Sequence, residues 1–469
     1  MKLSANRLKI NFLNFFGYIR INHTKKIFYL LGTAYVSYIY SYYLNYLDWS
    51  GDYGLYILQA KSLQSGTLET LFEKVNLSLS LSKNSLPYSP DYYPFGLPVI
   101  FTITNIFHKW NIVFLKLLNP IVLVAIFFLF IKITNLKSPQ DYLLSFLSIV
   151  VTNNLLFFSN LQPSLVSSFF IILSYLFFDK NQKNISILFF LIACTVRTNS
   201  VFFVIYFLLN QKFKNNILYF LKLFLIFIMT YLTPTLFFKI NIFGKYEFSP
   251  IYEQNRNLLN LEKFYSECVD FLTKLSELIF FVRFSEATYI GLFLIFCIVL
   301  MSTKHRGFLV VLFFLFCSFF INYFVYLIDF KRVITPIIFV SIYFLSKIKL
   351  NNVSIFILSV FIIYNIFTSL NTVQNIDKSQ NVMSEGFYEV VNVLNKDYGN
   401  ELIGFSKPRV LMLYSDVISY KLTSENFQDV QKEGLVLCNK NFLNCPPFSS
   451  ETIFENYDFK IIKYENFSN

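Results

Sequence analysis

Long apolar segments recur along this chain, and they limit what it can fold into more than any other feature. A helix that crosses a bilayer needs about 20 predominantly apolar residues, and the chain is 55% hydrophobic with a mean hydropathy of +0.51. Candidate spans lie at 28–47, 111–131, 141–158, 163–178, 185–196, 201–210, 217–238, 286–302, 308–327, 333–346 and 352–370. We therefore expect an all-α polytopic membrane bundle of about eleven spans rather than a soluble protein.

Basic residues cluster beside these apolar segments, as the positive-inside rule predicts for cytoplasmic loops. A chain that starts in the cytoplasm and crosses eleven times places all of the clusters inside and its C-terminal region outside. Binding to nucleic acid is not expected, because the charges are dispersed between spans instead of forming one surface. The clusters are Lys2 to Lys26, Lys132 to Lys137, Lys180 to Lys183, Lys212 to Lys214, Lys304 to Arg306 and Lys347 to Lys349.

Three apolar segments are too short for a full crossing. Residues 96–107 would rise about 18 Å as a helix, against a hydrocarbon core of about 30 Å, so we expect a half-helix that returns to the outer face. The segments 185–196 and 201–210 have basic clusters at both ends and predict a hairpin that dips in from the inside. Arg197 lies at its tip. An intramembrane Arg costs about 2.5–3.5 kcal/mol on insertion scales, so it needs a carboxylate partner or an anionic ligand.

The last hundred residues have a different character. Residues 371–469 hold 9 Lys and Arg and 13 Asp and Glu, a net charge of −4, so residues 1–370 carry +16. Short mixed patterns replace the long apolar runs. A segment of this length suffices for a small α/β domain, and we expect one outside the membrane.

The loop after the first span contains DWSGDYGLYILQAKSLQSG. From Gly51 onward its periodicity predicts a short helix with Asp52, Tyr56 and Gln59 on one face. Asp52 is also a good N-cap. The two roles are compatible, because an Asp at a helix N-terminus stays ionised and an ionised carboxylate can accept a proton.

GDYGLYILQAKSLQSG and the later YYPFGLP resemble the first extracytoplasmic loop of the GT-C class of polytopic glycosyltransferases. The similarity is to the branch with the protein mannosyltransferases and the lipid A aminoarabinose transferase. The resemblance implies that Asp52 is catalytic and makes Tyr56 and Tyr93 candidates for substrate contacts. Phe95 stands where the family pattern has a second proline. A similar Arg follows an apolar run in the family, which favours a functional Arg197.

A second local signal is DFKRVITP, which begins at Asp329 between two spans on the expected outer side. Lys331 and Arg332 oppose the positive-inside trend there and need an anion, which lipid head groups or Asp329 would also supply. The segment resembles the family's Arg-rich approach to a Pro-containing helix, which is implicated in binding the lipid-phosphate donor. In the expected outer loop 239–285, Arg256 is a weaker candidate for the sugar or phosphate site.

FSKPRVLMLYSDV, in the C-terminal region, resembles a Lys-Pro-Arg element that follows the last span in bacterial GT-C proteins. A further Arg often follows the Tyr in that element, whereas Ser415 and Asp416 stand here. Substrate contacts are therefore not assigned to Lys407 and Arg409.

Together these features predict an inverting glycosyltransferase that moves a sugar from a polyprenyl-phosphate donor to a hydroxyl of a lipid, glycan or protein. The expected domains are a GT-C-like transmembrane domain, 1–370, with a catalytic loop at 48–95, and an extracytoplasmic domain, 371–469. We expect no metal and no cofactor, and a bacterial inner membrane location. An O-antigen polymerase or ligase and a lipid-linked sugar flippase or transporter remain alternatives. Asp48 and Asp91 are possible second carboxylates, with loop or capping roles favoured.

Overall fold

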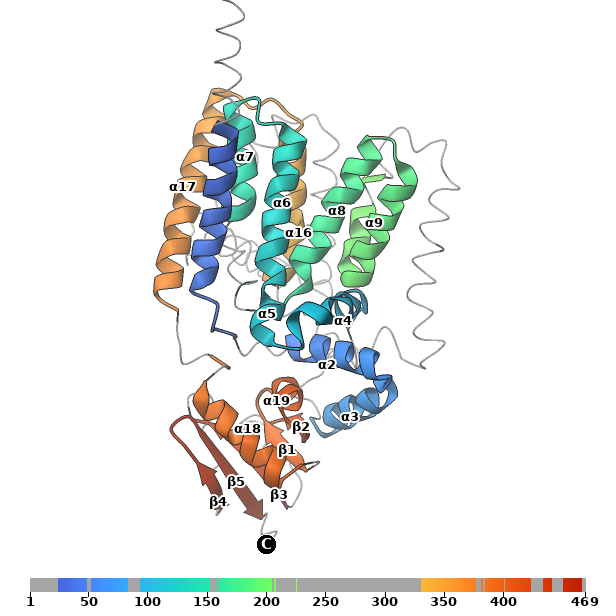
Figure 1. Cartoon of the computed structure of the whole chain (residues 1–469), viewed down its shortest axis with the longest axis vertical. Coiled ribbons are helices and arrows are strands. Elements are labelled where there is room, and N and C mark those ends of the chain that lie inside the picture. Colours follow the sequence, from blue (N-terminus) through green and yellow to red (C-terminus); the bar gives the residue numbers. More distant parts are fainter. Residues whose placement is uncertain are drawn as a thin grey trace, which may run out of the picture.

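The computed structural model describes residues 24–48, 52–82, 93–151, 158, 160–204, 206–207, 225, 330–376, 381–382, 384–399, 401–422, 433–440 and 450–465. They form a helical bundle and a smaller part built on a β-sheet, with helices α2 and α3 between the two (Figure 1). The expected spans 286–302 and 308–327, the loop 239–285 and, except for residue 225, the span 217–238 lie outside the described residues.

Most of the long helices of the bundle run along the long axis of the molecule (Figure 1). Residues 24–41 form the first helix, and α2 and α3 (Asp52–Ser65 and Leu68–Leu81) lie across the lower end of the bundle. The others are α4 (Gly96–His108), α5 (Ile112–Lys116), α6 (Leu118–Thr134), α7 (Pro139–Val150), α8 (Pro163–Asp179), α9 (Lys183–Val196), the 3₁₀ helix η3 (Thr198–Val204), α16 (Phe330–Leu345) and α17 (Asn352–Gln374).

Local sequence explains where several helices begin and end. α6 ends at Asn135, which adopts a left-handed conformation with φ 58°, one that Asn tolerates better than most residues. α7 then starts with a capping box between Ser138 and Asp141 and with Pro139 in its first turn. This short turn sends α7 back along α6.

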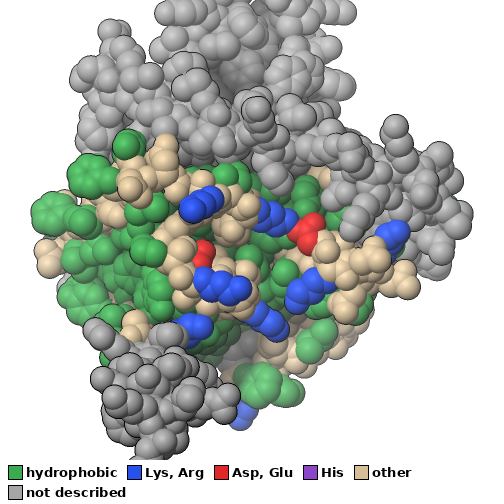
Figure 2. All heavy atoms as spheres, turned by 90° about the horizontal axis from the view of Figure 1, so that it is seen from above, with side chains coloured by type: hydrophobic (Ala, Val, Ile, Leu, Met, Phe, Trp, Pro, Cys, Tyr) green, Lys and Arg blue, Asp and Glu red, His purple; other side chains and the backbone are tan. Residues whose placement is uncertain are grey.

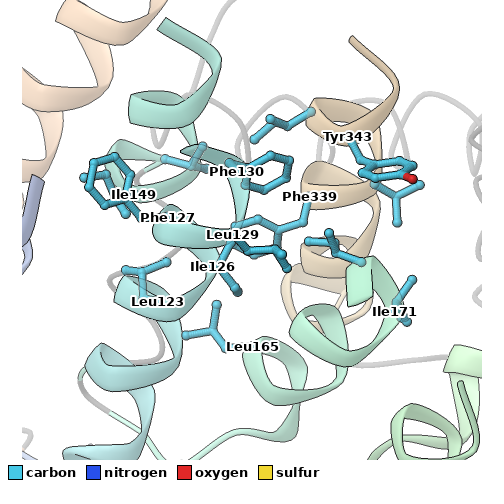
Figure 3. Packing of buried hydrophobic residues seen from close by; sticks show 14 of the residues in the cluster. Leu123, Ile126, Phe127, Leu129, Phe130, Ile149, Leu165, Ile171, Phe339 and Tyr343 are labelled. Atoms are coloured by element: carbon cyan, nitrogen blue, oxygen red, sulfur yellow. The ribbon is translucent and has the colours of Figure 1, made fainter. Parts of the chain in front are cut away.

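The core of the bundle is apolar and aromatic. Figure 3 shows its buried side chains interdigitating between neighbouring helices, and they belong to one cluster. The packing joins α6, α7, α8 and α16 into a single unit. Labelled members are Leu123, Ile126, Phe127, Leu129 and Phe130 of α6, Ile149 of α7, Leu165 and Ile171 of α8, and Phe339 and Tyr343 of α16.

Two helical stretches of the described chain are long and apolar enough to cross a membrane, judged by length and composition. They are Ile112–Thr134 and Asn352–Gln374, with mean hydropathies of 2.6 and 2.2. The other described apolar helices are shorter, so a bundle of about eleven spans stays a prediction. α17 presents an outward stripe of large apolar side chains, each 51–72% exposed, at Val353, Phe356, Val360, Ile363 and Phe367. Their spacing of three and four residues makes one continuous face, and an exposed apolar face of this kind is typical of a surface that contacts a bilayer or a partner.

Two expected segments differ from the helices observed. The helix expected over 141–158 ends at Val150, because Val151 is extended with ψ 120° and the Thr-Asn-Asn that follows has low helix propensity. The expected arm 201–210 begins instead as the 3₁₀ helix η3, which starts at Thr198. Its first residues, Thr-Asn-Ser, favour turns because their side chains compete for backbone hydrogen bonds.

The loops that carry the described basic clusters meet at one end of the bundle. Lys25 Nζ donates to the Asn135 carbonyl at 3.1 Å, which joins the first helix to the α6–α7 turn. Gln140 Nε2 donates to the Leu345 carbonyl at 3.1 Å, and Lys347 pairs with the last residue of α8. Figure 2 looks onto this end and shows Lys and Arg side chains gathered there. The sheet lies at the opposite end (Figure 1).

A network around Asp179 ties three segments together at this basic end. The carboxylate accepts hydrogen bonds from the hydroxyls of Tyr206 and Tyr343, each at 2.5 Å, and forms an ion pair with Lys347. Lys347 Nζ also lies 4.2 Å from the centroid of the Tyr343 ring. The Asp179 carboxylate therefore joins three segments. They are the end of α8, the chain after η3, and the end of α16 with the turn that follows it.

The smaller part contains a mixed five-stranded sheet with strand order β2-β1-β3-β5-β4. β1 pairs in parallel with β2 and β3, and β5 pairs antiparallel with β3 and β4. Two helices pack with it, α18 (Glu385–Asp397) and α19 (Pro408–Tyr414). The strands are β1 (Leu402–Phe405), β2 (Ile418–Lys421), β3 (Glu433–Asn439), β4 (Ser450–Glu455) and β5 (Phe459–Glu465).

Backbone hydrogen bonds fasten this part to the bundle. The Leu47 N–H donates to Asn381 Oδ1 at 3.0 Å, and the Leu47 carbonyl accepts from the Val382 N–H at 2.8 Å. At the far side, Ser82 Oγ after α3 accepts from the Lys421 N–H of β2 at 2.8 Å. One apolar cluster also runs from α2 and α4 into α18, α19 and the sheet. The two parts therefore share a core.

The arrangement predicts which ends of the bundle are accessible from outside a cell. In a variant without native cysteines, Tyr457→Cys at the tip between β4 and β5, where Tyr457 is 92% exposed, should react with a membrane-impermeant thiol reagent in intact cells. Lys349→Cys, exposed at the basic end, should react only after permeabilisation. Equal labelling of both variants in intact cells would contradict the expected topology.

The Asp179 network predicts a local stability effect. Asp179→Ala removes two hydrogen bonds to a charged acceptor and an ion pair, and should lower the free energy of unfolding by about 3 kcal/mol, since hydrogen bonds to charged groups contribute about 1.5–3 kcal/mol each. Tyr206→Phe removes one of them and should cost about half as much. Thermal unfolding in detergent, followed by circular dichroism, measures both, and equal stability of Asp179→Ala and wild type would refute the role.

Candidate functional site

Buried polar side chains gather at the start of α8, at the end of the bundle that faces the sheet. Asn160 and Gln162 are each 4% exposed and Ser164 is fully buried. Pro163 opens α8, where its missing N–H and fixed φ suit the first turn, and Gln162 before it is extended. Burying a polar group without a partner costs about 1–3 kcal/mol, so this concentration marks a polar site within the bundle.

Asp48 reaches this polar group from the end of the first helix. Its Oδ1 accepts from Asn160 Nδ2 at 3.2 Å, and the Asn160 carbonyl accepts from Asn119 Nδ2 at 2.8 Å. Lys116, 1% exposed, donates to two backbone carbonyls at the end of the same helix and interacts electrostatically with Asp48. The Asp48 carboxylate therefore lies near the buried Lys116 ammonium group, beside the residues where α6 and α8 begin.

Arg197 approaches the start of α8 from α9. It follows the last residue of α9, with an extended backbone, and its Nη1 donates to Ser164 Oγ. Ser164 lies four residues after Asn160, so Arg197 and Asp48 contact the same short segment. The Nε2 atom of Gln162, in that segment, is buried and has no hydrogen-bond partner among the described residues. A carboxylate, a guanidinium and an open amide donor therefore converge where α8 begins.

A second constellation is built on α2. The rings of Tyr56 and Tyr93 stack at a centroid distance of 4.4 Å with an interplanar angle of 18°. The Gln59 amide holds the backbone of Tyr93 through two hydrogen bonds of 3.1 and 3.0 Å. Arg409 Nη1 donates to the Tyr93 hydroxyl at 2.7 Å, and its guanidinium carbon lies 5.3 Å from the ring centroid. The contacts lock Tyr93 between α2 and the sheet-bearing part.

Asp52 is the first residue of α2, and its side chain is not among those that the structure describes. At about 100° per residue, Asp52 shares a helix face with Tyr56 and Gln59. Both of those residues contact Tyr93. The expected face of α2 is therefore the one that meets the YYPFGLP segment.

Two glycines let the elements of the site approach closely. A Cβ on Gly54 would lie 2.6 Å from the Arg409 carbonyl oxygen, so α2 touches the backbone of α19. A Cβ on Gly96 would lie 2.5 Å from the Val196 nitrogen and 2.7 Å from the Thr195 oxygen. The start of α4 therefore rests on the end of α9, directly before Arg197.

Three further residues were predicted for the site, and the structure describes the side chain of none of them. Lys331 and Arg332 lie in the first turn of α16, and their side chains are not described. The last residue of α16 is at the basic end, and 16 residues rise about 24 Å, so the first turn lies toward the end where Arg197 and Asp48 meet. Arg256 lies outside the described residues.

Sequence reasoning missed three parts of the site. The polar run NLQPS, residues 160–164 at the start of α8, carried a detectable signal, because five successive residues with four polar or proline positions interrupt two apolar segments. Asp48 was favoured as a loop or capping residue, and its contact with Asn160 was not foreseen. Arg409 was left unassigned, and its contact with Tyr93 had no local signal.

No protein-family model matches this chain, and no curated protein matches it significantly.

The close contact at Gly96 predicts a measurable cost for a single methyl group. Gly96→Ala should lower the free energy of unfolding by about 1–3 kcal/mol, the usual range for overpacking, because backbone atoms of α9 must shift. Gly399→Ala is the matched control, since its Cβ would meet its nearest neighbour at 3.6 Å, an ordinary contact. Thermal unfolding of both variants tests this, and equal stability would contradict the packing of α4 on α9.

Proposed function

We propose that this chain is a membrane glycosyltransferase of the GT-C kind, which transfers a sugar from a polyprenyl-phosphate donor to a hydroxyl acceptor with inversion. The observation that carries the proposal is the convergence of Arg197 and Asp48 on the start of α8. That place lies at the end of the bundle where α2 and the sheet-bearing part are attached. A carboxylate and cations are the groups that such a transfer requires.

In this reaction the acceptor hydroxyl attacks the anomeric carbon, and the bond from that carbon to the phosphate oxygen breaks. A base must take the hydroxyl proton, and cations must stabilise the departing phosphate. We assign the base to Asp52 by the resemblance of its loop, and phosphate binding to Arg197, Lys331 and Arg332. A single displacement inverts the anomeric centre, so a β-linked donor gives an α-linked product.

The aromatic residues near α2 fit contacts to the sugar. Tyr93 stacks on the buried Tyr56 and keeps part of its side chain exposed, and such an amphipathic ring suits a ligand with both C–H and O–H surfaces. Arg409 holds the Tyr93 hydroxyl and therefore acts as a positioning residue. Arg256 remains a weaker candidate for the same site.

The surroundings of the site agree with a donor that has a lipid tail. The outward stripe on α17 and the exposed Ile103, Ile106 and Phe107 of α4, each 69–78% exposed, fit contact with a bilayer. The basic end of the bundle lies opposite the sheet (Figures 1 and 2), which favours a cytoplasmic location for that end. We therefore propose a bacterial inner membrane location, with the reaction at the outer face and with no cofactor.

The experiment that tests this is transfer in vitro from a panel of polyprenyl-phosphate monosaccharides to membrane lipids and glycans. Asp52→Asn should reduce turnover by about 10²-fold or more, the usual contribution of a general base. Asp48→Asn, four residues earlier, tests the other carboxylate of the site, and its amide retains an oxygen for the Asn160 hydrogen bond. It should lose less than tenfold. Arg197→Ala should weaken donor binding.

Full activity of Asp52→Asn would refute the assigned base, and a large loss in Asp48→Asn alone would move that role to Asp48. If the wild type transfers no sugar from any donor, a polymerase or ligase becomes the better hypothesis. Transport of labelled lipid across vesicles without sugar transfer would favour a flippase.

A further inference from the structure

A cavity of about 300 Å³ lies between the bundle and the sheet-bearing part. Ile57 and Lys61 of α2 line one side, the α4–α5 turn lines another, and Tyr388 of α18 and Tyr414 of α19 complete it. Ile57 and Lys61 lie about 140° and 180° around α2 from Asp52. Counted in the same way Tyr56 lies at about 40°, so the cavity is on a different side of α2 from the Tyr56 and Tyr93 stack, about 100–140° away, and it is a second site.

Lys61 brings an ammonium group to this cavity. The residue is half-buried, and among the described residues none forms an ion pair or a side-chain hydrogen bond with its Nζ. Burial lowers the pKa of Lys61, which is the effect of partial removal from water with no compensating negative charge. A ligand with an anionic oxygen would restore the lost interaction.

Tyr414 brings a second unsatisfied group. Its hydroxyl is buried and has no hydrogen-bond partner among the described residues. Burial raises the pKa of Tyr414, so the phenol stays protonated and donates at neutral pH. Edge-on contacts with Phe387 and Tyr388, at centroid distances of 5.5 and 6.0 Å, hold the ring. Two donors, one of them charged, thus line a single cavity.

The turn between α4 and α5 contributes Trp110 to the wall of the cavity, and the backbone of this turn is strained. Lys109 and Trp110 both adopt left-handed conformations, with φ 44° and 61°, which are uncommon for residues other than Gly, Asn and Asp. Trp110 lines the cavity, and its indole N–H donates to Gln64 at 3.1 Å. Strained backbone that persists is concentrated at ligand sites. Asn111, also in the lining, uses its side-chain oxygen to cap α5 and leaves its amide N–H groups for a ligand.

We propose that this cavity binds a polyol phosphate, with the phosphate held by Lys61 and Tyr414 and the polyol lying against Trp110 and Asn111. A volume of 300 Å³ equals about ten waters at 30 Å³ each, which accommodates a group the size of glycerol phosphate. The group is either part of a phospholipid head group or a soluble or glycan-borne ester. The proposal for this cavity does not depend on the proposed transfer reaction.

Binding can be measured with the full-length protein in a neutral detergent. The chain has two tryptophans, so a Trp49→Phe background leaves Trp110 as the only indole reporter. Glycerol phosphate should change its emission in a saturable way, and neutral glycerol should not. Lys61→Met and Tyr414→Phe should each weaken binding about tenfold or more, since each removes one hydrogen bond to a charged group. Lys74→Met on α3, whose residue does not line the cavity, is the matched control and should bind as the parent does.

Nanodiscs separate the two sources of the ligand. If the occupant is a lipid head group, nanodiscs containing phosphatidylglycerol should shift Trp110 emission and block glycerol phosphate, whereas phosphatidylcholine alone should not. If it is a soluble or glycan-borne ester, glycerol phosphate should bind equally in both. Absence of a saturable change with either ligand form, or unchanged binding in both Lys61→Met and Tyr414→Phe, overturns the proposal. Lys61 has no ion pair among the described residues, so removal of its charge should not lower thermal stability, and a loss of binding is then not a loss of fold.

Discussion

Both ends of α8 are held by charged side chains, and the described bundle is arranged around that helix. At one end the Asp179 carboxylate joins Lys347 and two tyrosines. At the other end Arg197 binds Ser164 beside the segment that Asp48 contacts through Asn160. Between these ends the packing is mostly apolar, with uncharged hydrogen bonds between Ser174 and Ser186 and from the Tyr175 hydroxyl to the Phe203 carbonyl. A buried charge is tolerated only where partners or ligands satisfy it, and the charged contacts described for this helix lie at its two ends.

The two ends differ in a way that separates structure from chemistry. Asp179 is surrounded by partners from three segments, and the network accounts for its charge. At the start of α8, a buried amide donor has no partner among the described residues. Satisfied networks stabilise a fold, whereas incompletely satisfied buried groups indicate a place for a ligand or water. The reaction is therefore proposed at the second end.

α2 lies between the bundle and the sheet-bearing part and contacts residues of both. One face carries Tyr56 and Gln59 toward Tyr93, and a different face carries Lys61 into the cavity beneath α18 and α19. Gly54 lets the helix touch the backbone of α19 directly. A helix between two parts offers separate faces to each, so one short element contributes to two sites.

Local patterns in the sequence predicted the start and the face of α2, and the structure has that helix beginning at Asp52. Such features depend on residues within two turns of one another. The end of α7 was predicted wrongly and the 3₁₀ helix at the start of the expected arm 201–210 was not foreseen, because apolar composition alone does not distinguish a continuing helix from an extended exit or a 3₁₀ turn. Expected roles for Asp52, Lys331 and Arg332 stay predictions.

By itself, the sequence determined that the chain is apolar in periodic stretches, that its basic residues lie beside them and that Asp52, Tyr56 and Gln59 share a face, since helical periodicity and composition are local. Only the tertiary structure decided that Arg409 meets Tyr93, 316 residues earlier, and that Tyr414 faces the cavity with Lys61. These contacts depend on how closely distant segments approach. The distance between such segments depends on the close glycine contacts, on the strained backbone at Trp110 and on the shared core. None of these features can be read from one stretch of sequence.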